Sequence, residues 1–131
     1  MAVADNKRIL RKWLKALQAG DMETLLALQS KDCVWLLPGS EKLPWAGRWK
    51  GAARQKIYLR RIDGAVDFGK QEFKEFIADG GRIVVTGQEI ARSKPNGKRW
   101  NVTFAWAFTL KRGKVVAWEA FENTEIIAAC Y

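Results

Sequence analysis

The side chains that most often carry acid–base and nucleophilic catalysis are scarce in this sequence. It contains no histidine, which excludes Ser-His-Asp and Cys-His catalysis and histidine-based zinc sites. The two cysteines, Cys33 and Cys130, suggest neither a disulfide framework nor a metal cluster, and neither has a visible activating partner. Catalysis would therefore depend on carboxyl and phenol groups, and we expect no metal and no cofactor.

Aromatic residues are abundant, with seven Trp and six Phe among 131 residues. Such rings either fill a core or line an apolar cavity. Hydrophobic residues make up 48% and charged residues 28%, which indicates a globular chain and excludes disorder. No repeat or linker divides the sequence, so we expect a single domain over residues 1–131. Without an 18-residue apolar run or a signal peptide at its start, the chain is expected to be cytoplasmic, with no membrane partner.

The net charge is +9, and the basic excess lies in the N-terminal half. Basic side chains recur at helix-like spacing in residues 7–15 and again in residues 54–61. They could form a surface for nucleic acid or an anionic membrane, or simply the solvated faces of two helices. We favour solvated faces and expect no nucleic-acid partner, because no nucleic-acid motif accompanies the charge.

Helical spacing of apolar residues predicts a first helix that Asp5 or Asn6 caps and Gly20 ends. Its apolar stripe consists of Ile9, Leu10, Trp13, Leu14 and Leu17. Asp21 is expected to cap a short second helix. A buried strand at residues 33–37, a loop through Pro44 and Gly47, and a third helix at residues 51–62 follow.

After Gly64 the apolar pattern changes from helical to alternating. Strands are predicted at residues 66–78, 82–92, 99–110 and 114–123, joined by tight turns rich in glycine. Three helices followed by four long strands indicate an α+β fold, with the helices on one face of a strongly curved, mostly antiparallel sheet. A hollow between helices and sheet is a common place for a small-molecule site.

Several short motifs, in order, resemble those of SnoaL-like proteins, which are grouped with ketosteroid isomerase in the nuclear transport factor two-like fold. They are Gly20-Asp21, Asp32-Cys-Val-Trp, Pro38-Gly39, Ala46-Gly47-Arg-Trp-Lys-Gly51 and Trp118-Glu-Ala-Phe-Glu-Asn-Thr. The last of these is also similar to limonene-epoxide hydrolase. The resemblance implies a cone-shaped α+β barrel, usually dimeric. Its relatives include isomerases, cyclases, hydrolases, dehydratases and non-catalytic binders, so fold alone does not define function.

The catalytic positions of these relatives map to residues that cannot ionise. The isomerase positions correspond to Trp13, Leu37 and Thr103, and the hydrolase positions to Gln88, Ile90 and Ala120. The acid of the SnoaL-type cyclases also corresponds to Ala120. A shift of one residue in this mapping brings Glu89 or Glu119 into consideration, although it also moves them to the opposite face of their strands. The three known mechanisms therefore lack their ionisable residues here.

The strand orientation that the family implies turns one mostly apolar set of side chains into the hollow. The set consists of Trp13, Leu17, Trp35, Leu37, Tyr58, Thr86, Gln88, Ile90, Asn101, Thr103, Ala105, Ala107, Val116, Trp118 and Ala120, with Trp45 and Trp49 at the mouth. Such a lining fits a small hydrophobic ligand. The alternative is that these large side chains fill the hollow as a packed core.

The same orientation turns Glu122 into the hollow, where an apolar environment would raise its pKa towards neutrality. Glu75 is a second candidate acid or base, and Tyr58 can donate a hydrogen bond to a ligand carbonyl. Glu122 can equally be a solvated residue at a strand end. Two hypotheses result: a small-molecule binding protein or enzyme of unknown reaction, or an acid–base enzyme (isomerase, cyclase or hydrolase) using Glu122 or Glu75 with Tyr58.

On residues 99–110 the implied orientation places a row of large apolar side chains on the outer face of the sheet. The row includes Phe104, Trp106 and Phe108, and Phe121 on the last strand extends it. An exposed apolar face of this size predicts a homodimer. The competing interpretation is that the orientation is reversed and these rings face the helices.

Overall fold

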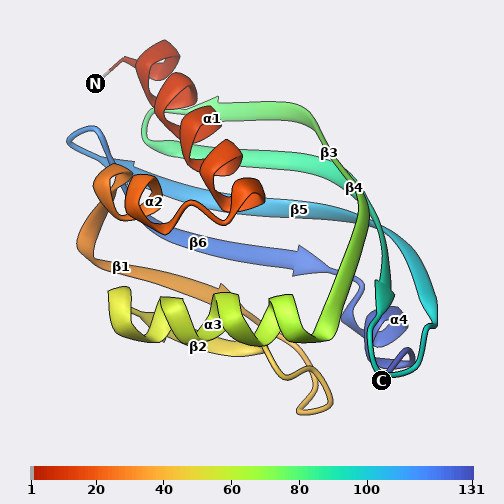
Figure 1. Cartoon of the computed structure of the whole chain (residues 1–131). Helices are drawn as coiled ribbons and strands as arrows, with labels where there is room; N and C mark the ends of the chain where they lie inside the picture. Colours follow the sequence, from red (N-terminus) through yellow and green to blue (C-terminus); the bar gives the residue numbers. More distant parts are fainter. Residues whose placement is uncertain (1) are drawn as a thin grey trace.

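The computed structural model describes residues 2–131 and has a helical N-terminal part followed by a long meander of strands (Figure 1). In chain order the elements are α1 Val3–Ala19, α2 Met22–Leu28, β1 Gln29–Leu37, β2 Gly47–Lys50, α3 Ala52–Ala65, β3 Val66–Asp79, β4 Arg82–Ser93, β5 Arg99–Lys111, β6 Lys114–Glu122 and α4 Thr124–Ala128. None of these helices is long and apolar enough to cross a membrane.

The six strands form one sheet in the order β2-β1-β6-β5-β4-β3. Neighbouring strands run antiparallel except β1 and β6, which are parallel. Figure 1 shows α1 and α3 lying across the same face of the curved sheet. The α+β class and the mostly antiparallel curved sheet are confirmed. The barrel is not: the sheet is open, because β2 and β3 end it on opposite sides.

Local sequence signals set several helix boundaries. Gly20 adopts the left-handed conformation at φ 67°, and its N–H reaches the carbonyls at the end of α1. The Asp21 side chain accepts a hydrogen bond from Thr24 N at 3.1 Å, which caps α2 as predicted. The predicted cap of α1 is wrong: the helix begins at Val3 without a side-chain cap. Asn6 is instead buried inside α1.

Two elements have no counterpart in the sequence prediction. Residues predicted as loop form the short strand β2, which pairs with β1 from Val34↔Lys50 to Leu37↔Gly47. Helix α4 follows β6, and the Asn123 side chain caps it by accepting from Ile126 N at 3.2 Å. Both elements are short, so neither shows a full period of apolar residues.

The orientation expected for β5 is wrong. The buried residues of this strand include Trp100, Val102, Phe104, Trp106, Phe108 and Leu110. Asn101 and Thr103 are exposed on the other face. The reason is that the helices cover one face only, and the larger apolar set is most stable where it leaves water. Of the residues expected to form a dimer interface, only Phe121 is exposed, at 50%.

The centre of the core is a cluster of tryptophans. Trp13 on α1 contacts Trp35 and Trp118 edge-to-face, with ring centroids 5.9 and 5.4 Å apart. The indole N–H groups of Trp13 and Trp35 donate to the buried Gln29 Oε1 at 3.1 and 3.3 Å. Gln29 in turn donates to Gln55 Oε1 at 2.7 Å. This satisfied polar chain anchors α1 and α3 to the sheet at defined positions.

Candidate functional site

A cavity of about 280 Å³ lies between α1, α3 and the covered face of the sheet. Its aromatic lining consists of Trp45, Tyr58, Phe68, Trp100, Trp106 and Trp118. Aliphatic side chains from α1, α3 and the strand ends complete the apolar part, namely Leu17, Leu37, Leu59, Ile62 and Val66. The remaining lining residues are Gln18, Gly69, Lys70, Gln71, Glu89 and Glu122.

Glu89 on β4 is the most deeply buried carboxyl group of the cavity, with 4% of its surface exposed. Its Oε2 accepts the indole N–H of Trp100 at 2.9 Å, and its Oε1 accepts Gln71 Nε2 at 2.9 Å. Burial raises the pKa of Glu89, and the bonds from Trp100 and Gln71 oppose that rise because they stabilise the carboxylate. Both oxygens are thus held by neutral donors.

Glu122, at the end of β6, is the second carboxyl group of the same cavity. Its Oε1 accepts the indole N–H of Trp106 at 3.2 Å. Burial, followed by the nearby charge of Glu89, raises the pKa of Glu122 to about 8, against a smaller lowering by the Trp106 bond. Two like charges in one apolar cavity cannot both form easily, so near neutrality Glu122 holds the proton.

Tyr58 on α3 is 3% exposed and packs between three rings of the core. Its ring lies 5.5 Å from Trp35 and 6.1 Å from Trp118, measured between centroids. Burial, then the charges of Glu122 and Glu89, raise the pKa of Tyr58 well above its ordinary value. Tyr58 therefore remains a phenol, which is a hydrogen-bond donor at every physiological pH.

One hydrogen-bond donor next to the cavity has no partner among the described residues. Trp118 is 1% exposed and lines the cavity, and its indole Nε1 has no hydrogen-bond partner among the residues that the structure describes. The indole N–H of a buried tryptophan usually finds a partner. The nitrogen atom itself is buried, so this N–H is not exposed to the cavity.

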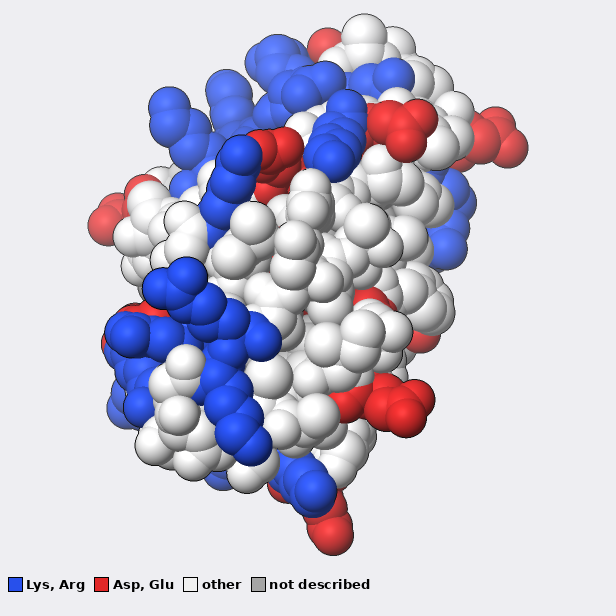
Figure 2. All heavy atoms as spheres, turned by 90° about the vertical axis from the view of Figure 1, so that its right-hand side faces the viewer, with Lys and Arg blue, Asp and Glu red and all other residues white. Residues whose placement is uncertain are grey.

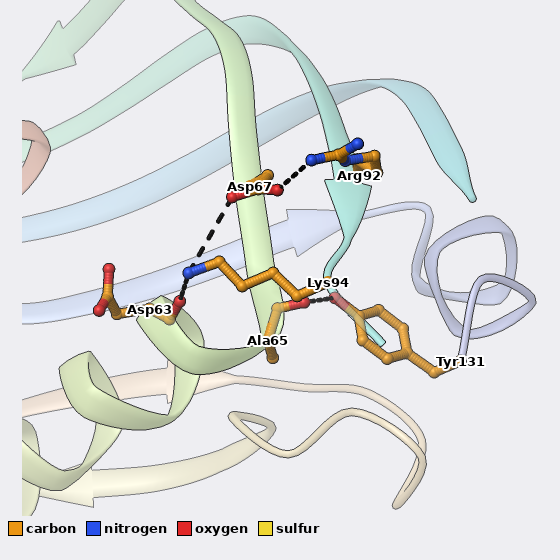
Figure 3. A network of polar contacts seen from close by, with 6 residues as sticks. All are labelled: Asp63, Ala65, Asp67, Arg92, Lys94 and Tyr131. Atoms are coloured by element: carbon orange, nitrogen blue, oxygen red, sulfur yellow. Dashed lines mark hydrogen bonds and ion pairs between the residues drawn. The ribbon is translucent and has the colours of Figure 1, made fainter. Parts of the chain in front are cut away.

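A polar network fixes the point where α3 passes into β3 (Figure 3). Arg92 pairs with Asp67 at 2.5 Å, and Lys94 Nζ donates to the Asp63 carbonyl. The Tyr131 hydroxyl donates to the Ala65 carbonyl at 2.5 Å. The lining residues of β3 begin at Val66, directly after this junction. The network therefore holds one wall of the cavity in place.

The structure brings part of the expected site together. Leu17, Leu37, Trp45, Tyr58, Trp118 and Glu122 all line the cavity. Trp13 and Trp35 belong to the packed core instead, and Ala120 is buried but is not part of the lining. Trp49 is covered by the guanidinium groups of Arg54 and Arg61, at 5.5 and 5.3 Å from its ring centroid. It also lies outside the lining.

Five other expected site residues lie on the opposite face of the sheet. They are Glu75, Gln88, Ile90, Asn101 and Thr103, none of which lines the cavity. Gln88 Nε2 donates to Asn101 Oδ1 at 2.7 Å, and Thr86 Oγ1 donates to Glu75 Oε1 at 3.0 Å. Gln88, Ile90, Asn101 and Thr103 are misplaced because the family-based orientation of β4 and β5 is offset by one residue. Glu75 lies on β3 and faces the same outer side as Thr86.

The same offset explains which site residues were missed. Glu89 is the residue between Gln88 and Ile90, and Trp106 lies between two alanines that were assigned to the hollow. Alternation of large and small residues on β5 is the signal that indicates the correct face. The described residues contain no group of three or more Cys, Asp or Glu side chains placed to hold a metal ion.

The basic side chains of the surface gather in separate groups, with uncharged surface between them (Figure 2). Residues 7–15 lie on α1, and residues 54–61 lie on α3. Lys70 is the one basic residue of the cavity lining, and its Nζ pairs with Glu72 Oε1 at 2.5 Å. The interior of the cavity is therefore acidic and aromatic, in contrast to the basic exterior.

The overall structure is similar to several solved structures. An NTF2-like protein from Burkholderia xenovorans LB400 is 28% identical, with a TM-score of 0.92 over 99% of this chain and 98% of that one. TerC, co-crystallised with polyporic acid, is 22% identical, with a TM-score of 0.85 over 96% and 97%. An LEH-like epoxide hydrolase from M. tuberculosis is 23% identical, with a TM-score of 0.71 over 94% and 86%.

A search of curated proteins gave no significant match. The sequence model of the SnoaL-like domain, in contrast, matches residues 10–118, which is most of the chain. This match agrees with the NTF2-like architecture of the solved structures and with the open curved sheet described above. The chain therefore belongs to the family of SnoaL-like domains.

Proposed function

We propose that this protein catalyses proton transfer on a small, mainly apolar substrate, with Glu89 as the base and Glu122 as the acid. The observation that carries the proposal is the presence of both carboxyl groups in one cavity with a mainly aromatic lining. Their environments differ: Glu89 accepts two N–H bonds, and Glu122 accepts one. Two carboxyl groups in different environments can act as an acid–base pair, in which one holds a proton while the other is ionised.

Glu89 suits the role of base because its donors orient it without neutralising it. Trp100 and Gln71 bind one oxygen each, and each oxygen keeps a further lone pair that can take a proton from a bound substrate. Burial makes this carboxylate a stronger base than one in water. The SnoaL-like family includes isomerases and ligand binders, and proton transfer is the step that isomerases require.

Glu122 suits the role of acid because its pKa of about 8 keeps it protonated at neutral pH. Tyr58 adds a neutral donor in the same lining, which can stabilise an oxygen that gains negative charge. This assignment keeps Glu122 and Tyr58 from the sequence analysis and replaces Glu75, which lies on the outer face, with Glu89.

The size of the cavity limits the substrate. An apolar cavity of about 150 Å³ accommodates one benzene ring, so about 280 Å³ corresponds to roughly two fused rings. A bicyclic ketone with exchangeable protons beside its carbonyl fits this volume. The compound 2-tetralone is a suitable test substrate, because exchange of those protons needs only a base and a donor to the carbonyl oxygen.

The test is deuterium incorporation into 2-tetralone in D2O, followed by NMR. We expect the protein to accelerate exchange, and Glu89→Gln and Glu122→Gln each to reduce the rate by at least about 100-fold. Glu75→Gln is the matched control and should retain the wild-type rate. The rate should fall above about pH 8 as Glu122 loses its proton. Binding without any acceleration over buffer would contradict the proposal.

A second candidate is a non-catalytic binding protein for small apolar molecules. It is favoured by the lining itself, in which eleven aromatic and aliphatic side chains outnumber the two acids. The positions that carry the known mechanisms of the family also hold residues that cannot ionise. In this case Glu89→Gln and Glu122→Gln would bind 2-tetralone as the wild type does, with no exchange in any of the proteins.

A further inference from the structure

We propose that the natural ligand of this cavity is a small organic cation, in which an ammonium or iminium group is carried on an apolar frame. The inference rests on the proposed function, because it assigns a substrate class to the same site. Two independent features of the cavity support it: the aromatic rings of its walls and the absence of a cationic partner for its carboxyl groups.

Aromatic rings come from α3, from β3, β5 and β6, and from the loop before β2. The six are Trp45, Tyr58, Phe68, Trp100, Trp106 and Trp118. Four of them are tryptophans, whose faces attract cations more strongly than other rings do. Aromatic cages of this kind are used to recognise quaternary ammonium groups. A neutral hydrocarbon would be held as well by aliphatic side chains, so the excess of indoles favours positive charge.

The carboxyl groups of the cavity have no basic partner in the part of the chain that the structure describes. Glu89 and Glu122 form no ion pair there, and their bonds come from indole and amide N–H groups. Lys70, the one basic lining residue, is paired with Glu72. A buried carboxylate without a counter-ion is costly, and a bound ammonium group supplies the missing charge.

The titratable groups that face the cavity come from four elements. They are Tyr58 from α3, Lys70 from β3, Glu89 from β4 and Glu122 from β6. Tyr131 lies behind the wall, where its ring packs on Trp45 and Trp100 with centroids 5.4 and 6.0 Å apart. Glu72 balances the charge of Lys70. With Glu89 ionised and Glu122 protonated, one negative charge then remains inside the cavity for a single cation to balance.

The exterior of the protein opposes a cation, since the net charge is +9. Salt screens this repulsion beyond about 8 Å at physiological ionic strength, whereas contacts inside the cavity are screened much less. A preference for a cation would therefore come from the cavity itself. A binding site governed by the surface would instead prefer an anion.

The test compares three compounds of similar size by titration of tryptophan fluorescence. Benzyltrimethylammonium is the cation, neopentylbenzene is its uncharged isostere, and phenylacetate is the anion. We expect the cation to bind at least about tenfold more tightly than the isostere, and the anion to bind most weakly. Equal or tighter binding of the isostere or of phenylacetate would overturn the inference.

Variants locate the binding of the cation. Glu89→Gln should weaken the binding of benzyltrimethylammonium by about tenfold and leave the affinity for neopentylbenzene unchanged. The reason is that glutamine removes the charge but keeps the shape of the side chain and an acceptor for Trp100. Glu75→Gln should change neither affinity. Raising the pH from about 6 to about 9 should increase the affinity of the wild type for the cation, but not that of Glu122→Gln. Circular dichroism establishes that each variant is folded, and an unchanged cation affinity in both cavity variants would overturn the inference.

The outcomes separate this inference from the proposed function. If 2-tetralone exchanges and the exchange depends on Glu89, but the cation binds no better than its isostere, proton transfer stands and the substrate class is wrong. If the cation is preferred and that preference depends on Glu89, but no ketone exchanges, the cation site stands and the catalytic role is wrong.

Discussion

Trp106 on β5 donates its indole N–H to the Glu122 carboxyl on β6, with Nε1 and Oε1 3.2 Å apart. The two residues belong to neighbouring strands, and Trp106 is 3% exposed. One side chain thus serves as a wall of the cavity, as part of the core and as the hydrogen-bond donor to the candidate acid. This relationship links the stability of the sheet to the chemistry of the site.

Trp106→Glu should fail to fold or lose at least about 3 kcal/mol in the free energy of unfolding, because it replaces a buried ring with an unpaired charge. Urea denaturation followed by circular dichroism measures the loss. Thr103→Glu on the exposed face of the same strand is the control and should stay folded. A soluble, fully folded Trp106→Glu protein of altered oligomeric state would instead place Trp106 in an interface between subunits.

The free energy of unfolding should decrease as the pH rises from about 4.5 to about 8. The reason is that the pKa of Glu122 is near its ordinary value of 4.5 in the unfolded chain but about 8 in the folded protein, so the folded state holds more protons in this range. Glu122→Gln removes this contribution. The free energy of unfolding of the variant, relative to that of the wild type, should therefore rise by on the order of 2–4 kcal/mol across this pH range.

Thermal denaturation of both proteins at several pH values measures this difference. Glu75→Gln provides the reference for removal of a carboxylate outside the cavity, and its difference from the wild type should not follow the same pH range. A constant difference between Glu122→Gln and the wild type from about pH 5 to about pH 9 would show that Glu122 is not protonated in the folded protein.

Gly87→Ala should destabilise the protein by about 1–3 kcal/mol, because its added Cβ would collide with the Glu72 carbonyl and the Phe104 ring. Gly64→Ala is the matched control. Gly64 lies in α3 with nothing within 4 Å of the added Cβ, so alanine should stabilise the helix by about 0.5–1 kcal/mol. Opposite signs in urea denaturation are the expected result, and two stabilising changes would contradict the packing at Gly87.

Cys33 should resist alkylation in the folded protein. It is 0% exposed, and burial raises the pKa of its thiol to about 12, so almost no thiolate forms at neutral pH. Cys130 is also buried, at 6% exposed. Mass spectrometry after iodoacetamide treatment should show no adduct on native protein and two adducts in guanidinium. Rapid native labelling of Cys33 would reveal an opening of β1 that the structure does not show.

The first three helices and the tight turns were predictable because their signals are local. Gly20 and Asp21 act within one turn of chain, and the structure uses both as the sequence indicates. β2 was not predictable, because four residues carry no clear period and the strand exists through its pairing with β1. Whether a sequence forms such a strand depends on distant partners, which a local pattern does not contain.

Orientation of the strands was the decisive difficulty for the site. The four long strands after Gly64 were recognised, but assigning Thr103 to the inner face placed Trp106 on the outer face. Assigning Gln88 to the inner face likewise placed Glu89 on the outer face. The period of two makes a shift of one residue exchange the whole set of side chains on a face. The alternation of large and small residues on β5 carried the correct answer, and the positions borrowed from the family overrode it.

The parallel pairing of β1 with β6 bears on how the protein emerges during synthesis. Trp35 on β1 is aligned with Trp118 on β6, at the centre of the sheet and at opposite ends of the chain. While the ribosome is still making the later strands, β1 and β2 have no neighbour on that side. The last long strand must therefore close the core, and a nascent chain stalled before β6 would display its tryptophans to chaperones.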